Sequence, residues 1–190
     1  NGPKPFIGSL GNLLGTGHRF KETKDNSPCF SLAEYKDGAS RGNGGVNVLT
    51  GLVFDFDHLP KSKMGQIRSF IKDYAYASYS TFSHQANGPD DNCFRIVLLP
   101  SRMVTPLEFS QIWPALNGQM GGDADQSAKD PARVFFFPFC PSARKRHAFL
   151  SYRDGNLLNP DQFINDLKEK TPPAALVSRR EIGPLMEISE

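Results

Sequence analysis

The sequence lacks any apolar run near the roughly 20 residues that a membrane-spanning helix needs, and it shows no secretory signal pattern. We therefore expect a cytosolic protein without a membrane partner. Cysteine is also scarce, because Cys29, Cys93 and Cys140 are far apart, odd in number and form no C-x-x-C pair. This pattern supports neither a disulfide framework nor a zinc site, and it predicts buried or incidental thiols.

Acidic residues are absent from one stretch of the chain, between Pro131 and Arg153. That stretch holds five of the basic residues and one histidine, whereas the net charge of the whole chain is only +2. The overall charge predicts no polyanion partner, but the local excess of positive charge is suited to phosphate groups. A solvated basic loop is the commoner outcome of such a run.

Residues 51–60, GLVFDFDHLP, place two carboxylates inside an apolar run. In a strand, alternation sends Phe54 and Phe56 into a core and leaves Asp55 and Asp57 together on the other face. Neighbouring like charges are unfavourable unless a cation, a shared proton or water relieves them. The same pattern also fits an ordinary half-exposed edge strand. Evidence from other parts of the chain is needed to distinguish a cation-binding strand from an ordinary one.

From residue 52 onward, the hydrophobic pattern predicts a succession of strands and helices. We expect four strands, at residues 52–57, 74–82, 94–99 and 133–138. One helix is expected at residues 61–73. A second has Thr105 as its N-cap, Pro106 at its first position and Glu108 in a capping box, and Gly121-Gly122 ends it.

The resulting order, β-α-β-β-α-β, is that of the split βαβ unit of ferredoxin-like folds. The predicted class is α+β, a ferredoxin- or RRM-like palm with two helices on one face of the sheet and the other face free. The first and third strands are central in that arrangement, which puts Asp55 and Asp57 on one and Arg95 on the other. Two carboxylates beside a cation on a free face are a candidate site for a metal-bound phosphate.

Three regions are expected along the chain. Residues 1–50, rich in Gly, Ser and Asn, form a loop-rich N-terminal extension packed on the core. Residues 51–170 form the core itself, which ends with a further short strand within 147–158 and a helix at 161–170. Residues 171–190, which include a Pro-Pro pair and a polar end, are expected to act as a tether.

Three blocks of sequence, in order, resemble the catalytic core of the archaeo-eukaryotic primase superfamily, the primase-polymerases of plasmids, phages and mobile elements. They read VFDFD, then YSTFSHQ with FRIVLLP, then DQSAKDPARVFFFP. A lone D-x-D is a weak signal. Three ordered blocks spread over residues 50–140 are fairly specific.

This resemblance implies a template-dependent nucleotidyltransferase, a DNA primase/polymerase that uses nucleoside triphosphates and two Mg²⁺ or Mn²⁺ ions on a DNA template or primer. Asp55, Asp57 and Asp125 would be its catalytic, metal-binding carboxylates. Asp123 and Asp130 are alternative third ligands. The spacing to the DPAR sequence favours Asp125, and we interpret Asp130 as a turn residue before proline.

The second block departs from the usual Ser-x-His form, because Ser83-His84 precedes a polar loop and Arg95 occupies the strand position instead. Ser83, His84, Arg95 and Arg133 are the candidate nucleotide-binding residues. Either His84 from the loop edge or Arg95 from the sheet would hold the phosphates, and Arg95 is the better placed to face the carboxylates. An exposed loop position for His84 and an ion pair with Asp130 for Arg133 are the ordinary alternatives.

Two other features have competing interpretations. Strand alternation turns His58 away from the carboxylates, so we expect a packing or surface role for it rather than ligation. The phenylalanines of the third block are either base-stacking platforms or core residues, and we expect at least half to be core. These are Phe135, Phe136, Phe137 and Phe139.

The resemblance also implies partners. Arg144, Lys145 and Arg146 would suit the backbone of the DNA template or primer, and a helicase domain or protein beyond the C-terminus is expected by analogy. The setting would be replication of a plasmid, phage or mobile element in the cytoplasm of a prokaryotic host.

The alternative is a non-catalytic replication initiator that binds origin DNA through the same fold. A phosphotransferase or nuclease ranks last, because the D-x-D lacks the threonine two places on that phosphatases of the haloacid-dehalogenase type usually carry.

Overall fold

The computed structural model describes residues 11, 14–15 and 17–170, so the predicted tether lies outside the described residues. Four antiparallel strands form the main sheet in the order β10-β6-β7-β5. Their bounds are Leu52–Leu59 for β5, Tyr76–Ser80 for β6, Asn92–Leu98 for β7 and Leu150–Arg153 for β10. Strands and helices mix in one chain, which confirms the predicted α+β class.

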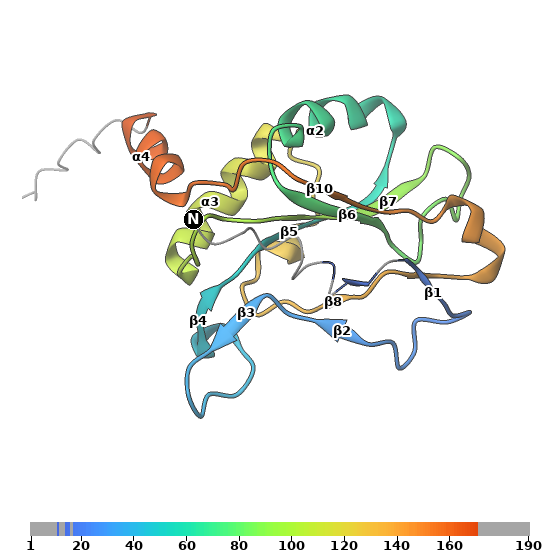
Figure 1. Cartoon of the computed structure of the whole chain (residues 1–190), viewed down its shortest axis with the longest axis horizontal. Helices are drawn as coiled ribbons and strands as arrows, with labels where there is room; N and C mark the ends of the chain where they lie inside the picture. Colours follow the sequence, from blue (N-terminus) through green and yellow to red (C-terminus); the bar gives the residue numbers. More distant parts are fainter. Residues whose placement is uncertain (1–10, 12–13, 16, 171–190) are drawn as a thin grey trace, which may run out of the picture.

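The helices in the described part of the chain are α2 (Met64–Ile71), α3 (Pro106–Gln119) and α4 (Pro160–Lys170). Figure 1 shows α2 along one side of the main sheet and four short strands along the opposite side, namely β1 (Arg19–Phe20), β2 (Cys29–Phe30), β3 (Ala33–Tyr35) and β8 (Phe135–Phe136). Within the described residues, no helix is both long enough and apolar enough to cross a membrane.

The start of α3 is as the sequence predicts. Thr105 Oγ1 accepts a hydrogen bond from the Glu108 backbone N–H, and Glu108 Oε2 accepts one from the Thr105 N–H at 2.8 Å. The two bonds satisfy backbone donors that the first turn of a helix leaves free. After the helix ends, Gly121 and Gly122 have φ angles of 110° and 82°, a conformation that glycine adopts without steric cost.

The predicted strand at residues 133–138 is wrong in its extent and in its pairing. Only Phe135–Phe136 (β8) is a strand there, and it pairs with Cys29–Phe30 (β2). Phe139–Cys140 (β9) pairs with Arg19–Phe20 (β1). Proline, which has no N–H to donate, separates β8 from β9 and prevents one continuous ladder. The main sheet takes β10 instead, so β6 and β7 are central and β5 lies at the edge.

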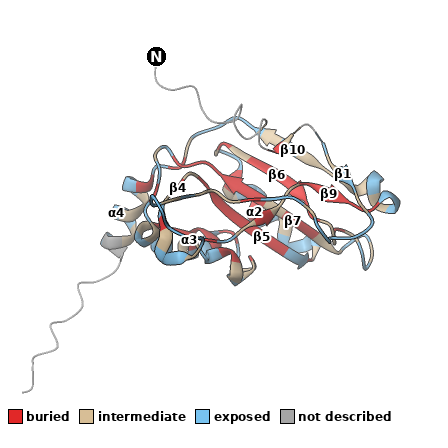
Figure 2. Ribbon diagram, turned by 90° about the horizontal axis from the view of Figure 1, so that it is seen from below, coloured by how far each residue is buried: buried red, intermediate tan, exposed pale blue. Residues whose placement is uncertain are grey.

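The second face of the main sheet is covered, which corrects the expectation of a free face. The Arg95 guanidinium, on that face, lies 5.5 Å from the ring centre of Phe135, and Tyr79 donates a hydrogen bond to the Phe136 carbonyl at 3.0 Å. Figure 2 shows β5, β6 and β7 buried along most of their lengths. Strands β3 (Ala33–Tyr35) and β4 (Val46–Leu49) pair beside this layer.

The four phenylalanines of the third sequence block divide as expected. Phe135 and Phe139 are buried, with 6% and 3% of their surface exposed. Phe136 and Phe137 are half-buried. Half of the set therefore belongs to the core. The other two side chains are partly exposed and line a cavity beside the sheet.

Candidate active site

A cavity of about 200 Å³ lies between the second face of the main sheet and the segments that cover it. Its walls bring together carboxylates that are distant in the sequence and three basic side chains. The carboxylates are Asp55, Asp57 and Asp125, and the basic residues are Lys24, Arg95 and Arg133. All three predicted metal ligands and both predicted nucleotide-binding arginines therefore border one space. Their roles as ligands stay predictions.

Asp55 is buried, with 6% of its surface exposed, and it stands opposite Arg95 in the β5–β7 register. Arg95 donates from Nε at 2.9 Å and from an Nη at 2.7 Å, both to Asp55 Oδ2. The other oxygen, Oδ1, is buried without a hydrogen-bond partner among the described residues. Burial raises the pKa of Asp55, and the charges of Asp57 and Asp125 act in the same direction, while Arg95 opposes them.

Arg95 is held from several sides. Besides Asp55, it donates to the Phe136 carbonyl at 3.2 Å, and its guanidinium lies over the rings of Phe135 and Tyr79. Burial disfavours its charge, but the oxygens of Tyr79 and Asp55 outweigh this effect and raise the pKa of Arg95. Arg95 is therefore a permanent and immobilised cation at the floor of the cavity.

Asp57 is exposed, two residues further along β5, at the point where the strand ladder becomes irregular. Among the described residues its side chain has neither an ion pair nor a hydrogen bond. Both oxygens of Asp57 are thus free to bind a cation at the mouth of the cavity.

Asp125 is brought to the cavity by its own backbone. Its N–H donates to the Asp55 carbonyl at 2.7 Å, which fixes the loop after α3 against the edge of β5. Its side chain caps the short 3-10 helix Gln126–Lys129 by accepting from the Ser127 N–H at 2.9 Å and from the Ser127 hydroxyl. These hydrogen bonds, with Arg133 and Arg95 nearby, lower the pKa of Asp125.

The two alternative third ligands are engaged elsewhere. Asp123 forms an ion pair with Lys63 at 2.5 Å. Asp130 accepts a hydrogen bond from the Ala132 N–H at 2.9 Å, which is the turn role expected for an aspartate before proline. Neither side chain borders the cavity. The geometry therefore favours Asp125 over both alternatives.

His84 does not border this cavity, and it is not the exposed loop histidine that was one of the expectations. It is buried, with 7% of its surface exposed, and it lines a separate cavity of about 300 Å³ between α2 and the main sheet. Its Nδ1 accepts a hydrogen bond from the Cys93 N–H at 3.2 Å, and burial lowers its pKa. Ser83 lies beside it in the same turn. Of the two phosphate-binding candidates, only Arg95 reaches the carboxylates.

The three basic residues predicted to contact DNA lie on the 3-10 helix Ser142–His147. Arg144 donates to the Phe82 carbonyl at 2.6 Å and lies 5.5 Å from the centre of that ring. Lys145 lies 4.8 Å from the ring centre of Phe20, and Arg146 donates to His147 at 2.8 Å. Within the described part of the chain, none of the three is paired with a carboxylate. Their charges therefore remain available to an anionic partner.

Three residues at the cavity, Lys24, Thr81 and Phe82, were missed by reasoning from sequence. Phe82 lines the cavity, and the exposed Lys24 lies 5.6 Å from the centre of its ring. Phe82 belongs to the YSTFSHQ block, which is a usable signal. Lys24 has no local signal, because its position depends on the pairing of β1 with β9, more than 100 residues away.

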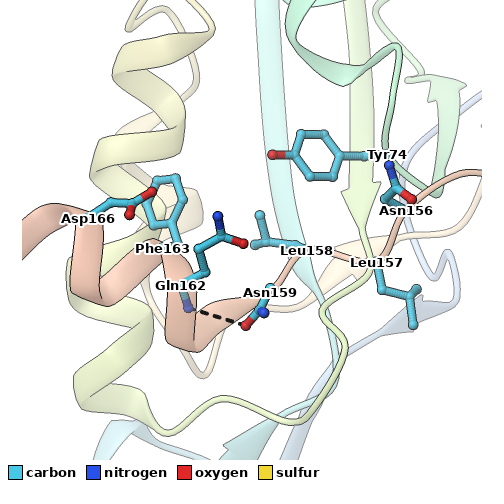
Figure 3. A pocket seen from close by; sticks show the side chains of 8 residues that line it. All are labelled: Tyr74, Asn156, Leu157, Leu158, Asn159, Gln162, Phe163 and Asp166. Atoms are coloured by element: carbon cyan, nitrogen blue, oxygen red, sulfur yellow. Dashed lines mark hydrogen bonds between the residues drawn. The ribbon is translucent and has the colours of Figure 1, made fainter.

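A larger cavity, of about 310 Å³, lies at the start of α4 (Figure 3). It is bordered by Tyr74, by the segment 156–159 and by the first turns of the helix. Asn159 Oδ1 accepts the Gln162 N–H there at 3.3 Å, which is a helix-capping bond. None of the predicted site residues borders this cavity, so it is not part of the candidate active site.

Comparisons with known proteins address the class of the chain. The family model of the VapE N-terminal domain matches residues 21–174, and the chain belongs to this family. Among solved structures, the chain is similar to the AEP domain (PP-N190) of the primase-polymerase of cyanophage S-2L. That match has 12% sequence identity and a TM-score of 0.49, and it covers 73% of this chain and 69% of the other. No curated protein matches the chain.

Proposed function

We propose that residues 51–170 are the catalytic core of a template-dependent nucleotidyltransferase, a DNA primase/polymerase that uses ribo- or deoxyribonucleoside triphosphates. The observation that carries this proposal is the meeting of Asp55, Asp57 and Asp125 in one cavity with Arg95 and Arg133. In such a site the carboxylates hold the metal ions, and the metal ions and the fixed cations together neutralise the phosphate.

The donor set fits Mg²⁺ or Mn²⁺, since hard divalent cations prefer oxygen ligands. The unpaired Oδ1 of Asp55 is a buried acceptor that a cation would satisfy, and both oxygens of Asp57 are free. Asp55, Asp57 and Asp125 would hold the ions. When bound, two such ions neutralise charge on the attacking and leaving oxygens of nucleotidyl transfer.

The size of the cavity limits which part of a nucleotide it takes. At about 200 Å³ it is smaller than the roughly 300–1,000 Å³ of typical small-molecule sites, so only the phosphate part of a nucleotide fits inside. Arg133 and Lys24, both exposed on its wall, would then bind phosphate oxygens. The sugar and base would lie outside it, beside Phe82 and Phe137, which also line the cavity.

The basic 3-10 helix is the part of the surface proposed to contact DNA. Arg144 is anchored on Phe82, which itself lines the cavity, so positive charge continues from the cavity to this helix. A template backbone along Arg144, Lys145 and Arg146 would pass beside the site of transfer. Replication of a plasmid or phage in a prokaryotic cytoplasm, with a helicase as partner, completes the proposal.

A non-catalytic replication initiator is the second candidate, and the Asp55–Arg95 pair is the observation that favours it. Arg95 already neutralises Asp55 through two hydrogen bonds to one oxygen. In an initiator this ion pair would serve only the fold, and the basic helix would bind origin DNA without any need for metal.

The deciding experiment is nucleotide incorporation on a single-stranded DNA template, with and without a primer, in Mg²⁺ and in Mn²⁺. Asp57→Asn should lower the rate by roughly 10²–10³-fold, the loss typical of removing one preorganised electrostatic group. Its unfolding free energy should stay within about 0.5 kcal/mol of the wild type, because the side chain is exposed.

The matched control is Asp123→Asn, which changes a carboxylate in the same loop as Asp125 but outside the cavity. It should retain wild-type incorporation, since its side chain pairs with Lys63 on the surface. Wild-type protein that binds DNA but incorporates no nucleotide with either metal would overturn the polymerase proposal and establish the initiator.

A further inference from the structure

Three side chains with different donor atoms meet at the far end of β5. His58 lies on that end, Asp91 in the turn before β7 and Cys93 on β7. Nδ1 of His58 is 2.7 Å from Oδ1 of Asp91, and Sγ of Cys93 is 3.9 Å from each of these two atoms. None of the three residues borders the cavity of the candidate active site. They form a cluster that is separate from the carboxylate cavity.

A β-bulge creates this cluster. Phe56 pairs with Phe94 and Leu59 pairs with Asn92, so two residues of β5, Asp57 and His58, stand opposite one residue of β7. The backbone of His58 has a φ of 54°, and its N–H donates to the Cys93 sulfur at 3.3 Å. The irregular backbone turns the imidazole towards Cys93 and the preceding turn, instead of along the regular strand.

Asp91 is oriented by a second contact. Its Oδ2 accepts a hydrogen bond from the Asn87 N–H at 3.0 Å, which leaves Oδ1 directed at His58. Metal-binding carboxylates commonly have the oxygen that does not face the metal held by a hydrogen-bond donor, which preorganises the ligand. The turn that carries Asp91 is thereby set in place before any ion binds.

We propose that His58, Asp91 and Cys93 bind a zinc ion, or another divalent transition metal that accepts mixed nitrogen, oxygen and sulfur ligands. Magnesium and calcium are excluded by the donor set, because they take oxygen ligands, whereas imidazole and thiolate suit zinc. The site is therefore chemically distinct from the carboxylate cavity.

The distances in the cluster are close to those that a tetrahedral ion requires. Zinc-to-ligand bonds of about 2.0–2.3 Å place two tetrahedral ligands roughly 3.4–3.6 Å apart. Cys93 is 3.9 Å from both of the other donors, so it needs to move only a few tenths of an ångström. His58 and Asp91, now in a hydrogen bond at 2.7 Å, would separate slightly as the ion replaces the shared proton.

The burial of the three ligands indicates how the ion would reach them. Cys93 is fully buried and the Asp91 side chain is 8% exposed, but the His58 side chain is 60% exposed. The site therefore opens to solvent past the imidazole, and its fourth position is accessible to water. Metal binding would release the thiol proton, because the thiolate is the form of cysteine that binds zinc.

A bound ion would tie three segments together: the end of β5, the turn before β7 and β7 itself. Asp57 is the direct neighbour of His58 on the bulge. Fixing this bulge would also fix the strand end that carries the most exposed carboxylate of the candidate active site. Structural metal sites contribute their binding energy to folding in this way.

The test is a titration of the metal-free full chain with Co²⁺, whose thiolate complexes absorb in the near ultraviolet. Wild-type protein should develop a cobalt–thiolate band at one ion per chain, and Zn²⁺ should remove it. Cys93→Ser should abolish the band. Cys140→Ser, a change at the other buried thiol, is the matched control and should leave the band intact.

His58→Asn gives a second, independent variant. Asparagine tolerates a positive φ, so it keeps the bulge while removing the imidazole. Loss of a direct ligand should weaken Co²⁺ and Zn²⁺ binding by at least about 100-fold, the upper end of what outer-shell changes cause. A wild-type protein without a cobalt–thiolate band, or a band that survives at full strength in both variants, would overturn the proposal.

Discussion

The two faces of the main sheet use the same strands for different purposes. On the helix side, Phe54 stacks on Trp113 with ring centres 5.2 Å apart, and Phe56 stacks on Phe94 at 4.9 Å. On the other side, between these two phenylalanines in sequence, Asp55 pairs with Arg95. Alternation along a single strand thus separates the packing that stabilises the fold from the charges that border the cavity.

The coverings of the two faces also differ. The helix side is closed by α2 and α3 with apolar side chains such as Ile67 and Ile112, which are almost fully buried. On the cavity side, cations rest on aromatic rings, as Arg95 does on Phe135 and Arg19 on Phe137. Aromatic faces can cover a sheet and still accept charge, which aliphatic side chains cannot. Substitutions on the two faces should therefore have different consequences.

The largest effect is expected on the helix side, for Trp113→Ala. Trp113 is fully buried, and its Nε1 donates to the Val53 carbonyl at 2.8 Å. Truncation should lower the unfolding free energy by about 3–5 kcal/mol, through the cavity left behind and the loss of the hydrogen bond. Urea unfolding measures this change. Phe137→Ala on the half-buried opposite face should cost clearly less, and equal losses would remove the distinction between the faces.

A smaller loss is expected on the cavity side, for Arg95→Met. This change leaves Asp55 buried without its cation and should cost about 3 kcal/mol at neutral pH. The folded-state pKa of Asp55 is already raised above its unfolded value, and it should rise further in the variant. The penalty is therefore present above the folded-state pKa and shrinks as the pH falls through it, because Asp55 then takes up a proton.

Unfolding of Arg95→Met at neutral and at mildly acidic pH checks the sign of this dependence. The double variant Arg95→Met with Asp55→Asn removes the buried charge and should recover most of the stability. A deficit that is the same at every pH would mean that Asp55 is not charged in the folded protein, which contradicts the contrast drawn between the two faces.

The smallest effect is expected at the capping box of α3, for Glu108→Gln. Hydrogen bonds from Arg102 and Thr105 lower the pKa of Glu108 from 4.5 to about 2. Its stabilising contribution is therefore complete above pH 4.5 and is lost as the pH falls towards 2. The variant should lose about 1 kcal/mol at neutral pH and unfold with a weaker acid dependence. Glu34→Gln, an exposed change on β3, is the control and should alter neither.

The parts of the fold that were predictable from sequence are those with local causes. The VFDFD alternation, the Thr105–Glu108 capping box and the glycine stop after α3 all depend on residues within a few positions of one another. The pairing of β8 with β2 and of β9 with β1 depends on contacts across more than 100 residues. No local pattern in RVFFFP distinguishes these partners from β5, so the extent and partners of that strand were predicted wrongly.

The candidate site divides in the same way. Motif resemblance and spacing were enough to select Asp55, Asp57 and Asp125 as candidate ligands. They did not predict that Arg95 donates two hydrogen bonds to one oxygen of Asp55. His58 shows the limit most clearly. His58 is exposed and faces away from the carboxylate cavity, as alternation predicts, but a one-residue bulge also places its imidazole against Asp91 and near Cys93, a contact that alternation does not predict. Bulges depend on the partner strand, so a single segment does not reveal them.

The outer side of β5 has a consequence for how this protein behaves in a crowded solution. A strand at the border of a sheet offers its backbone to strands of other molecules, which is a common route to aggregation. Here the carbonyls of Val53 and Asp55, two residues apart and on the same side, are already taken by Trp113 and by the backbone of Asp125. The loop that delivers the third carboxylate therefore also shields the border strand from pairing with a second copy.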